Sequence, residues 1–122
     1  MRFTKMNGAG NDFIIINNLE EHITPSLVPH IARTLCHRHL SLGADGLMAV
    51  DTPRQGGDYR MLFYNSDGSE GEMCGNGARC ICRYGYEKGL AGETQTVSLA
   101  RIQIHKPLRT HPSWLSVLYF PR

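Results

Sequence analysis

The residues best suited to chemistry lie between positions 65 and 80, where the sequence reads NSDGSEGEMCGNGARC. Cys74 stands directly before a Gly-Asn-Gly segment and the expected start of a helix. Backbone N–H groups at a helix N-terminus attract anions and stabilise a thiolate, so Cys74 is expected to have a lowered pKa. The same N–H groups can hold a carboxylate, which the missing side chains of Gly75 and Gly77 allow to approach closely. This pattern is suited to removing a proton alpha to a carboxylate.

The same segment also has a purely structural interpretation, in which a glycine-rich turn precedes a helix and Cys74 is a small buried hydrophobe. Residue types and spacing alone leave both interpretations open. Asp45 has two interpretations as well: it forms the local turn, which we favour, or it supports the site. Arg79 and Arg83 lie about one helical turn apart and are expected to form ion pairs with neighbouring carboxylates.

Six cysteines and histidines between positions 36 and 82 raise the question of a metal. Their spacings lack the paired Cys-x2–4-Cys knuckles of structural zinc sites, so no metal is expected. Cys80 and Cys82 are expected to pack inside the helix that follows Cys74, and Cys36 to end an earlier helix.

Length and composition limit the class of protein. A chain of 122 residues, 41% of them hydrophobic, is long enough for the core of one domain. Its formal charge of +2 and scattered basic residues give no reason to expect nucleic-acid binding. No stretch approaches the roughly 20 apolar residues of a membrane helix, and no leader is apparent, so we expect a cytoplasmic protein with free thiols.

Hydrophobic periodicity predicts alternating strands and helices. Strands are expected at 13–16, 47–50 and 59–64, a helix from about 24 to 39, and a weak strand or strand pair at 94–104. The best-defined helix starts at Asn76 or Gly77 and runs to Lys88, with Gly89 as a left-handed C-terminal cap. From His105 onward the apolar residues show no clear period, so no element is assigned there.

Four blocks of sequence resemble the N-terminal signatures of the diaminopimelate epimerase family, in family order and at family-like spacing. They are KMNGAGNDF (5–13), GADG (43–46), FYNSDGSE (63–70) and MCGNGARC (73–80). The resemblance implies an α+β fold, in which a mixed, curved sheet wraps around a central helix at 77–88. Family members have two such lobes with the active site between them.

The resemblance also implies a function: interconversion of LL- and meso-diaminopimelate, without a cofactor, through two cysteines on opposite faces of the alpha carbon. Cys74 matches the thiolate that removes the alpha proton. Asn11 and Asn65 match positions that hydrogen-bond the substrate. Gly75 and Asn76 match the backbone donors that hold the reacting carboxylate.

The chain departs from the family in several places. Gly46 and Asn7 stand where some members have Gln and many have His, respectively. The second cysteine motif, and the Arg and Glu-Arg pair for the distal end of the substrate, are missing. Residues 1–100 are therefore expected to form one lobe, inactive alone. Residues 101–122 are expected to be a divergent tail, disordered or arising from a frameshifted or truncated reading frame.

Two alternative functions remain at this point. One is a proline or hydroxyproline racemase-like enzyme, although Asn76 stands where those enzymes more often have His. The other is a non-catalytic truncated lobe that binds a partner chain. The expected partners are an amino-acid substrate and either a second copy of the chain or a separate second lobe, with no nucleic acid and no membrane.

Overall fold

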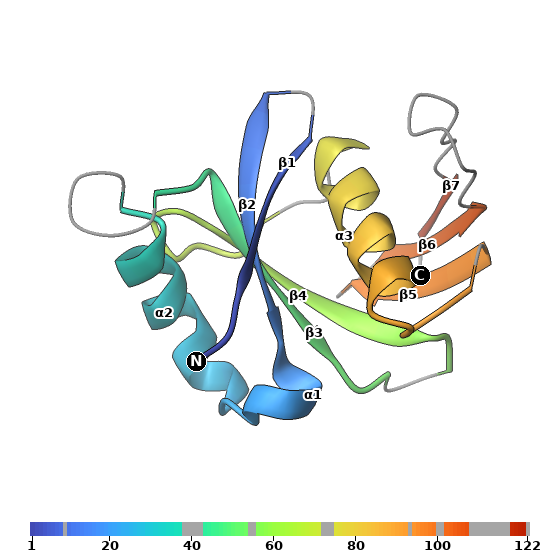
Figure 1. Ribbon diagram of the computed structural model, residues 1–122, viewed down its shortest axis with the longest axis horizontal. Helices are drawn as coiled ribbons and strands as arrows, with labels where there is room; N and C mark the ends of the chain where they lie inside the picture. The colour runs from blue at the N-terminus through green and yellow to red at the C-terminus, as the bar shows by residue number, and fades with distance from the viewer. Residues whose placement is uncertain are drawn as a thin grey trace.

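In the part of the chain that the structure describes, seven strands form one mixed sheet, and helices pack on its two faces (Figure 1). The computed structural model describes residues 1–8, 10–37, 43–53, 56–71, 75–92, 94–99, 102–107 and 118–121. Its elements are β1 (Thr4–Gly8), β2 (Asn11–Asn17), α1 (Asn18–Glu21), η1 (Pro25–Leu27), α2 (Val28–Leu35), β3 (Gly46–Asp51), β4 (Tyr59–Asn65), α3 (Gly75–Glu87), β5 (Thr94–Leu99), β6 (Ile102–Pro107) and β7 (Leu118–Pro121).

The strands lie side by side in chain order, from β1 to β7. Neighbours are antiparallel except for two parallel pairs, β2 with β3 and β4 with β5. Parallel neighbours need a crossover connection, and the chain supplies one at each place. The segment carrying α1, η1 and α2 joins β2 to β3, and α3 joins β4 to β5.

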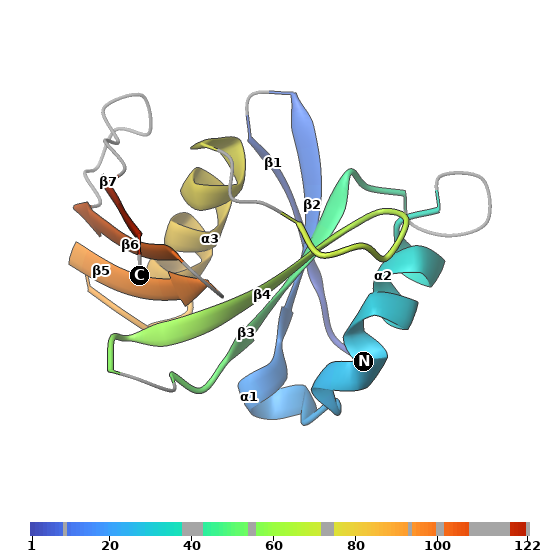
Figure 2. The ribbon, with the colours of Figure 1, turned by 180° about the vertical axis from the view of Figure 1, so that it is seen from behind.

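The central strands are buried on both faces. In β2, Phe13 and Ile15 belong to the core cluster that includes α3, whereas Ile14 and Ile16 pack with the residues of α2. This division explains why the sequence at 13–16 is a continuous apolar run without alternation. Figure 2 shows β3 and β4 crossing the molecule between α2 and α3.

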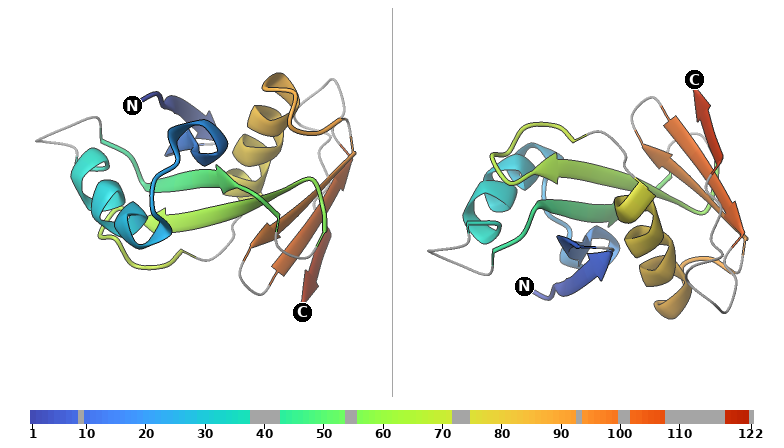
Figure 3. Two further views of the ribbon diagram at one scale, coloured as in Figure 1. Left: turned by 90° about the horizontal axis from the view of Figure 1, so that it is seen from below. Right: turned by 90° about the horizontal axis from the view of Figure 1, so that it is seen from above.

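The sheet bends sharply where β4 meets β5. Within the described residues these strands pair only at Tyr59 with Val97 and at Arg60 with Ser98. Beyond this point β5, β6 and β7 turn away, and α3 lies in the angle between the two parts of the sheet (Figure 3). The α+β class, the mixed curved sheet and the central helix expected from the sequence are confirmed.

The end of α3 agrees with the sequence pattern in detail. Gly89 adopts a φ of +72°, the left-handed conformation expected of a C-terminal cap. The Leu90 N–H donates to Gly85 O at 2.8 Å and the Gly89 N–H to Tyr86 O at 3.2 Å. These two bonds are those of a Schellman motif, so the helix ends where its glycine predicted.

Other elements differ from the expectation. Neither β1 nor the short α1 was predicted, and α2 ends at Leu35; the predicted end near His39 lies outside the described residues. No element was assigned after His105, but β6 continues to Pro107 and β7 follows. These strands form by pairing with sheet neighbours, a non-local contribution that periodicity does not register. The proposed boundary between lobe and divergent tail stays a prediction.

A buried polar cluster, formed by the Tyr59 and Gln95 side chains, joins the sheet to the C-terminal half of α3. The Gln95 Nε2 group donates to Cys82 O at 2.7 Å, so its Oε1 faces the Tyr59 hydroxyl, 2.6 Å away. That hydroxyl also lies 3.0 Å from Ile81 O. Burial, and then the nearby Cys82 and Asp58, raise the pKa of Tyr59, which keeps its hydroxyl a hydrogen-bond donor.

Gly85 makes this cluster sterically possible, which yields a stability prediction. A Cβ at Gly85 would lie 2.6 Å from the Tyr59 hydroxyl and 2.9 Å from Gln95 Oε1. Overpacking costs about 1–3 kcal/mol, more than the roughly 1 kcal/mol that alanine gains over glycine inside a helix. Gly85→Ala should therefore lower the free energy of unfolding by about 1–2 kcal/mol in urea denaturation, with the hydrogen bonds of Tyr59 adding to the loss. Gly92→Ala, where a Cβ meets nothing within 4 Å, is the matched control. Equal stabilities of the two variants would contradict the prediction.

Candidate functional site

The family-matched residues gather at one end of the sheet. Strand register aligns Phe13 of β2 with Gly46 of β3, and Gly46 with Asn65 of β4. Asn11, two residues before Phe13, therefore lies at the same end as Asn65. The first turn of α3 reaches this end beside β1 and β2, at the top of the view in Figure 1.

The approach of α3 to β1 depends on Gly8. A Cβ at this position would lie 2.8 Å from Cys80 Sγ and 2.9 Å from Asn76 O, both on α3. Any side chain at Gly8 would thus push the start of the helix away from the hairpin of β1 and β2. Gly46 is restricted in a similar way, since a Cβ there would lie 2.7 Å from Cε1 of Phe63. Phe63 therefore leaves no room for a side chain at Gly46 without moving.

A hydrogen bond between two asparagines joins α3 to β2. The Asn76 Nδ2 group donates to Asn11 Oδ1 at 2.7 Å, across 65 residues of sequence. Both side chains are half-buried. The guanidinium of Arg79, one turn along α3, donates to Asn76 Oδ1 at 3.2 Å. Two residues that the family resemblance assigned to substrate binding are therefore in direct contact.

Asp45 holds the start of β2 beside this pair. Its Oδ2 accepts the Asp12 N–H at 2.8 Å and lies 3.5 Å from Asn11 Nδ2, at the limit of a hydrogen bond. In return, the Asp45 N–H donates to Asp12 O at 2.9 Å. Of the two interpretations of Asp45, these contacts favour support of the site over a purely local turn.

Asn65 is oriented by its own turn. Its Nδ2 donates to Ser69 Oγ at 3.0 Å, and the Ser69 hydroxyl donates to Asp67 Oδ1 at 2.6 Å. Hydrogen bonds from the Ser69 hydroxyl and N–H lower the pKa of the exposed Asp67 carboxyl. Because the Asp67 carboxylate stays ionised over the ordinary pH range, it keeps accepting the Ser69 hydroxyl proton. The Ser69 oxygen therefore remains an acceptor for the Asn65 amide N–H.

Cys74 lies outside the described residues, whereas Gly75, the residue after it, begins α3. The other three cysteines, Cys36, Cys80 and Cys82, are buried, with exposed fractions of 2%, 3% and 0%. The expectation that Cys80 and Cys82 pack inside the helix is confirmed.

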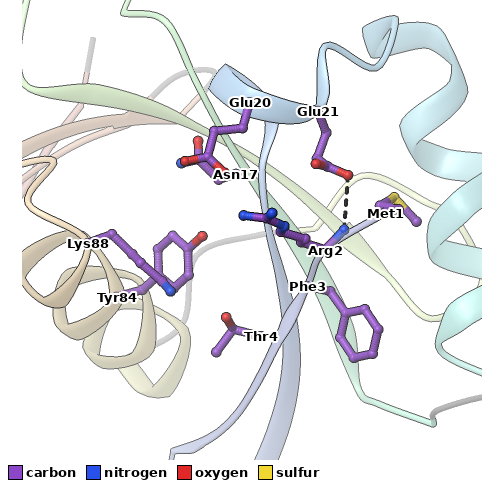
Figure 4. A pocket seen from close by; sticks show the side chains of 9 residues that line it. All are labelled: Met1, Arg2, Phe3, Thr4, Asn17, Glu20, Glu21, Tyr84 and Lys88. Carbon is purple, nitrogen blue, oxygen red and sulfur yellow. Dashed lines mark hydrogen bonds between the residues drawn. The ribbon is translucent and has the colours of Figure 1, made fainter.

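A pocket of about 450 Å³ opens at the opposite end of α3 (Figure 4). It is lined by Met1, Arg2, Phe3, Thr4, Asn17, Glu20, Glu21, Tyr84 and Lys88. Burial, and secondarily Glu20, raise the pKa of Tyr84, and the Lys88 ammonium lies 5.8 Å from its ring. None of the family-matched positions lines this pocket, so it is separate from the candidate site.

The arrangement of blocks matches a known family. Residues 3–102 match the family model described as diaminopimelate epimerase. The chain belongs to the diaminopimelate epimerase family. The match covers the sheet end with Asn11, Asn65 and Asn76, as well as the whole of α3.

Individual relatives agree with this assignment. The chain is 50% identical over 104 residues to the diaminopimelate epimerase of Moorella thermoacetica, covering 84% of this chain and 37% of that protein. It is 45% identical over 117 residues to that of Archaeoglobus fulgidus, covering 94% and 41%. The chain thus spans about two fifths of the length of these relatives.

A solved structure shares the fold. The crystal structure of a PhzF-family phenazine biosynthesis protein from Bacillus anthracis superposes with a TM-score of 0.62 at 17% identity, covering 88% of this chain and 35% of that one.

In the part of this chain that the structure describes, no helix combines the length and apolar character needed to cross a membrane.

Two residues near the site have contacts that sequence reasoning missed. Arg83 forms the expected ion pair with a carboxylate, Glu87, at 2.7 Å, whereas the described residues give Arg79 a hydrogen bond to the Asn76 amide and no ion pair. Asp45 was favoured as a turn residue, yet it bonds a strand 33 residues away. The only signal available was their presence inside the family-like blocks. The Asp45 contact joins residues 33 apart in sequence, and the Arg79 contact, although only three residues apart on α3, joins a cation to a neutral amide, which charge pairing does not predict.

Burial gives a prediction about the four thiols. Because three of them are enclosed by the core, we expect Cys74 to be alkylated first by iodoacetamide at neutral pH. Competitive alkylation across pH, followed by peptide mass spectrometry, measures this order. In guanidinium chloride all four should react, which controls for intrinsic differences between peptides. Earlier modification of Cys36, Cys80 or Cys82 in the folded chain would argue against Cys74 as the reactive thiol.

Proposed function

We propose that this chain provides one half of an active site that interconverts LL- and meso-diaminopimelate. In this proposal Cys74 is the thiolate that removes or returns the alpha proton on one face. The backbone N–H groups of Gly75 and Asn76 hold the reacting carboxylate, and Asn11 and Asn65 hydrogen-bond the substrate. The thiol for the opposite face comes from a second lobe, and no cofactor or metal takes part.

The observation that carries the proposal is the meeting of Asn11 and Asn76 at the first turn of α3, directly after Cys74 in the chain. The first turn of a helix has N–H groups without intrahelical acceptors, and its dipole favours an anion. No acidic side chain lies in the first turn of α3 to neutralise that end. A substrate carboxylate is thereby favoured next to the residue that would act on its alpha carbon.

The chemistry requires such donors because an alpha proton is weakly acidic. Removing it places negative charge on the carboxylate oxygens, and preorganised N–H groups stabilise that charge most when water is excluded. One lobe leaves the site open at the sheet end, and inversion also needs an acid on the other face. A second lobe is therefore needed for activity, and the isolated chain is expected to be inactive.

The activity test uses deuterium oxide. We expect the purified 122-residue chain to produce no detectable inversion of LL-diaminopimelate. Adding the C-terminal segment of the Moorella thermoacetica relative, from the point where its match to this chain ends, should supply the second lobe. Inversion with deuterium at the alpha carbon should then appear, measured by chiral chromatography and mass spectrometry.

The cysteine variants make this test specific. Cys74→Ala should abolish inversion by the mixture, whereas Cys36→Ala, a change in the core beneath α2, should leave it near the original rate. Inversion by the chain alone would disprove the half-site. Inversion by the mixture that survives Cys74→Ala would remove Cys74 from the mechanism. Binding of the two segments without inversion would favour a non-catalytic lobe.

A further inference from the structure

We propose that Arg79 and Asp45 are positioning residues, which together fix the orientation of the Asn76 and Asn11 side-chain amides at the substrate site. The orientation itself is a property of this chain. Its consequence for substrate affinity rests on the proposed function.

The four side chains form one directed chain of hydrogen bonds. The Arg79 guanidinium donates to Asn76 Oδ1 at 3.2 Å, and Asn76 Nδ2 donates to Asn11 Oδ1 at 2.7 Å. Asn11 Nδ2 then points to the Asp45 carboxylate at 3.5 Å. A cation thus stands at one end and an anion at the other, with two amides between them.

The charges of Arg79 and Asp45 determine the donor-to-acceptor direction of this series of hydrogen bonds. A guanidinium only donates hydrogen bonds and a carboxylate only accepts them, whereas an amide can turn by 180° and exchange its oxygen for its nitrogen. Turning the Asn76 amide alone would place its Nδ2 against Arg79 and its Oδ1 against Asn11 Oδ1. Turning both amides would face the Asn11 oxygen to the Asp45 carboxylate. Each alternative brings like groups together, so one orientation is selected.

Asp45 also acts through the backbone. Its 3.5 Å contact with Asn11 Nδ2 is weak, but its exchange of hydrogen bonds with Asp12, at 2.8 and 2.9 Å, is strong. This exchange sets where β2 begins, and therefore where the Asn11 side chain leaves the backbone. Arg79 acts on the other asparagine from the exposed side of α3.

The selected orientation has a chemical consequence for a ligand. Each of the two amide oxygens already accepts a hydrogen bond from its neighbour in this series of four side chains. Each amide nitrogen uses one N–H within the series and retains a second. The pair therefore presents donors beside the N-terminus of α3, and both features favour a carboxylate. Without Arg79 the Asn76 oxygen has no donor within this series of hydrogen bonds, so one of the two charges that keep it turned away from the ligand is lost.

The test uses nuclear magnetic resonance of the ¹⁵N-labelled 122-residue chain. Arg79→Met removes the cation and keeps an unbranched side chain. We expect it to shift the side-chain N–H signals of both Asn76 and Asn11, although Arg79 does not contact Asn11. Asp45→Asn, which keeps the side-chain shape, should shift the same two sets of signals from the opposite end.

Arg83→Met is the matched control. It removes the same charge one turn further along α3, where Arg83 pairs with Glu87 and its side chain is 42% exposed. The Asn11 and Asn76 side-chain signals should not move in this variant. Arg79→Lys, which restores a cationic donor, should return both sets of signals most of the way to their original positions.

Titration with meso-diaminopimelate, followed at the backbone N–H signals of Gly75 and Asn76, tests the consequence for binding. We expect Arg79→Met to raise the half-saturating concentration about tenfold, the effect of losing one charge-assisted hydrogen bond. Arg83→Met should leave this concentration unchanged.

The two proposals fail in different ways. If Arg79→Met moves only the Asn76 signals, or if Arg83→Met moves the Asn11 signals as much, the positioning role is wrong, whatever the ligand does. If the original chain does not bind diaminopimelate but the Asn11 and Asn76 signals respond together, the positioning role stands and the proposed substrate fails. If diaminopimelate binds and Arg79→Met changes neither its affinity nor the Asn11 signals, the proposed function stands and the positioning role fails.

Discussion

The close contact between the first turn of α3 and the hairpin of β1 and β2 is the constraint on which the site depends. Gly8 permits it, because a Cβ there would overlap Cys80 Sγ and Asn76 O. At the other half of the helix Gly85 permits a second close contact, with Tyr59 of β4. Two glycines thus allow α3 to lie directly on the sheet along its length. The position of its N-terminus is then determined by the packing of the whole helix.

Apolar packing and polar chemistry are divided between the faces and the end of the sheet. The two core clusters fill the faces, with α3 over one and α2 over the other. Polar groups collect at the end where β2 and β3 begin and β4 finishes. Because packed faces are rigid, amides placed at this end keep their separation without being buried completely. Hydrogen bonds that cross between elements, such as Asn76 to Asn11, then add direction to that rigidity.

The chain spans about two fifths of the length of the relatives that it matches. The half-site proposed for it depends on this relation. In that proposal one lobe orients a carboxylate through Asn11, Asn76 and the start of α3, all of which lie within residues 3–102, the part matched to the family. Inversion of a stereocentre needs groups on two opposite faces of the alpha carbon, and a site at a single sheet end supplies groups on one of them. The position of the site at one end of the sheet and the share of the relatives' length that the chain spans both fit the proposed half-site.

The sequence by itself determined the family, the existence of α3 and its end at Gly89, and the strands at the centre of the sheet. These features are encoded locally, in periodicity, in glycine conformations and in motif order. Only the tertiary structure decided that Asp45 holds β2, and that β1 and β7 are strands. Partners far apart in sequence make these choices, because an edge strand is stabilised by its neighbour, and a polar side chain bonds whichever group the fold brings within reach.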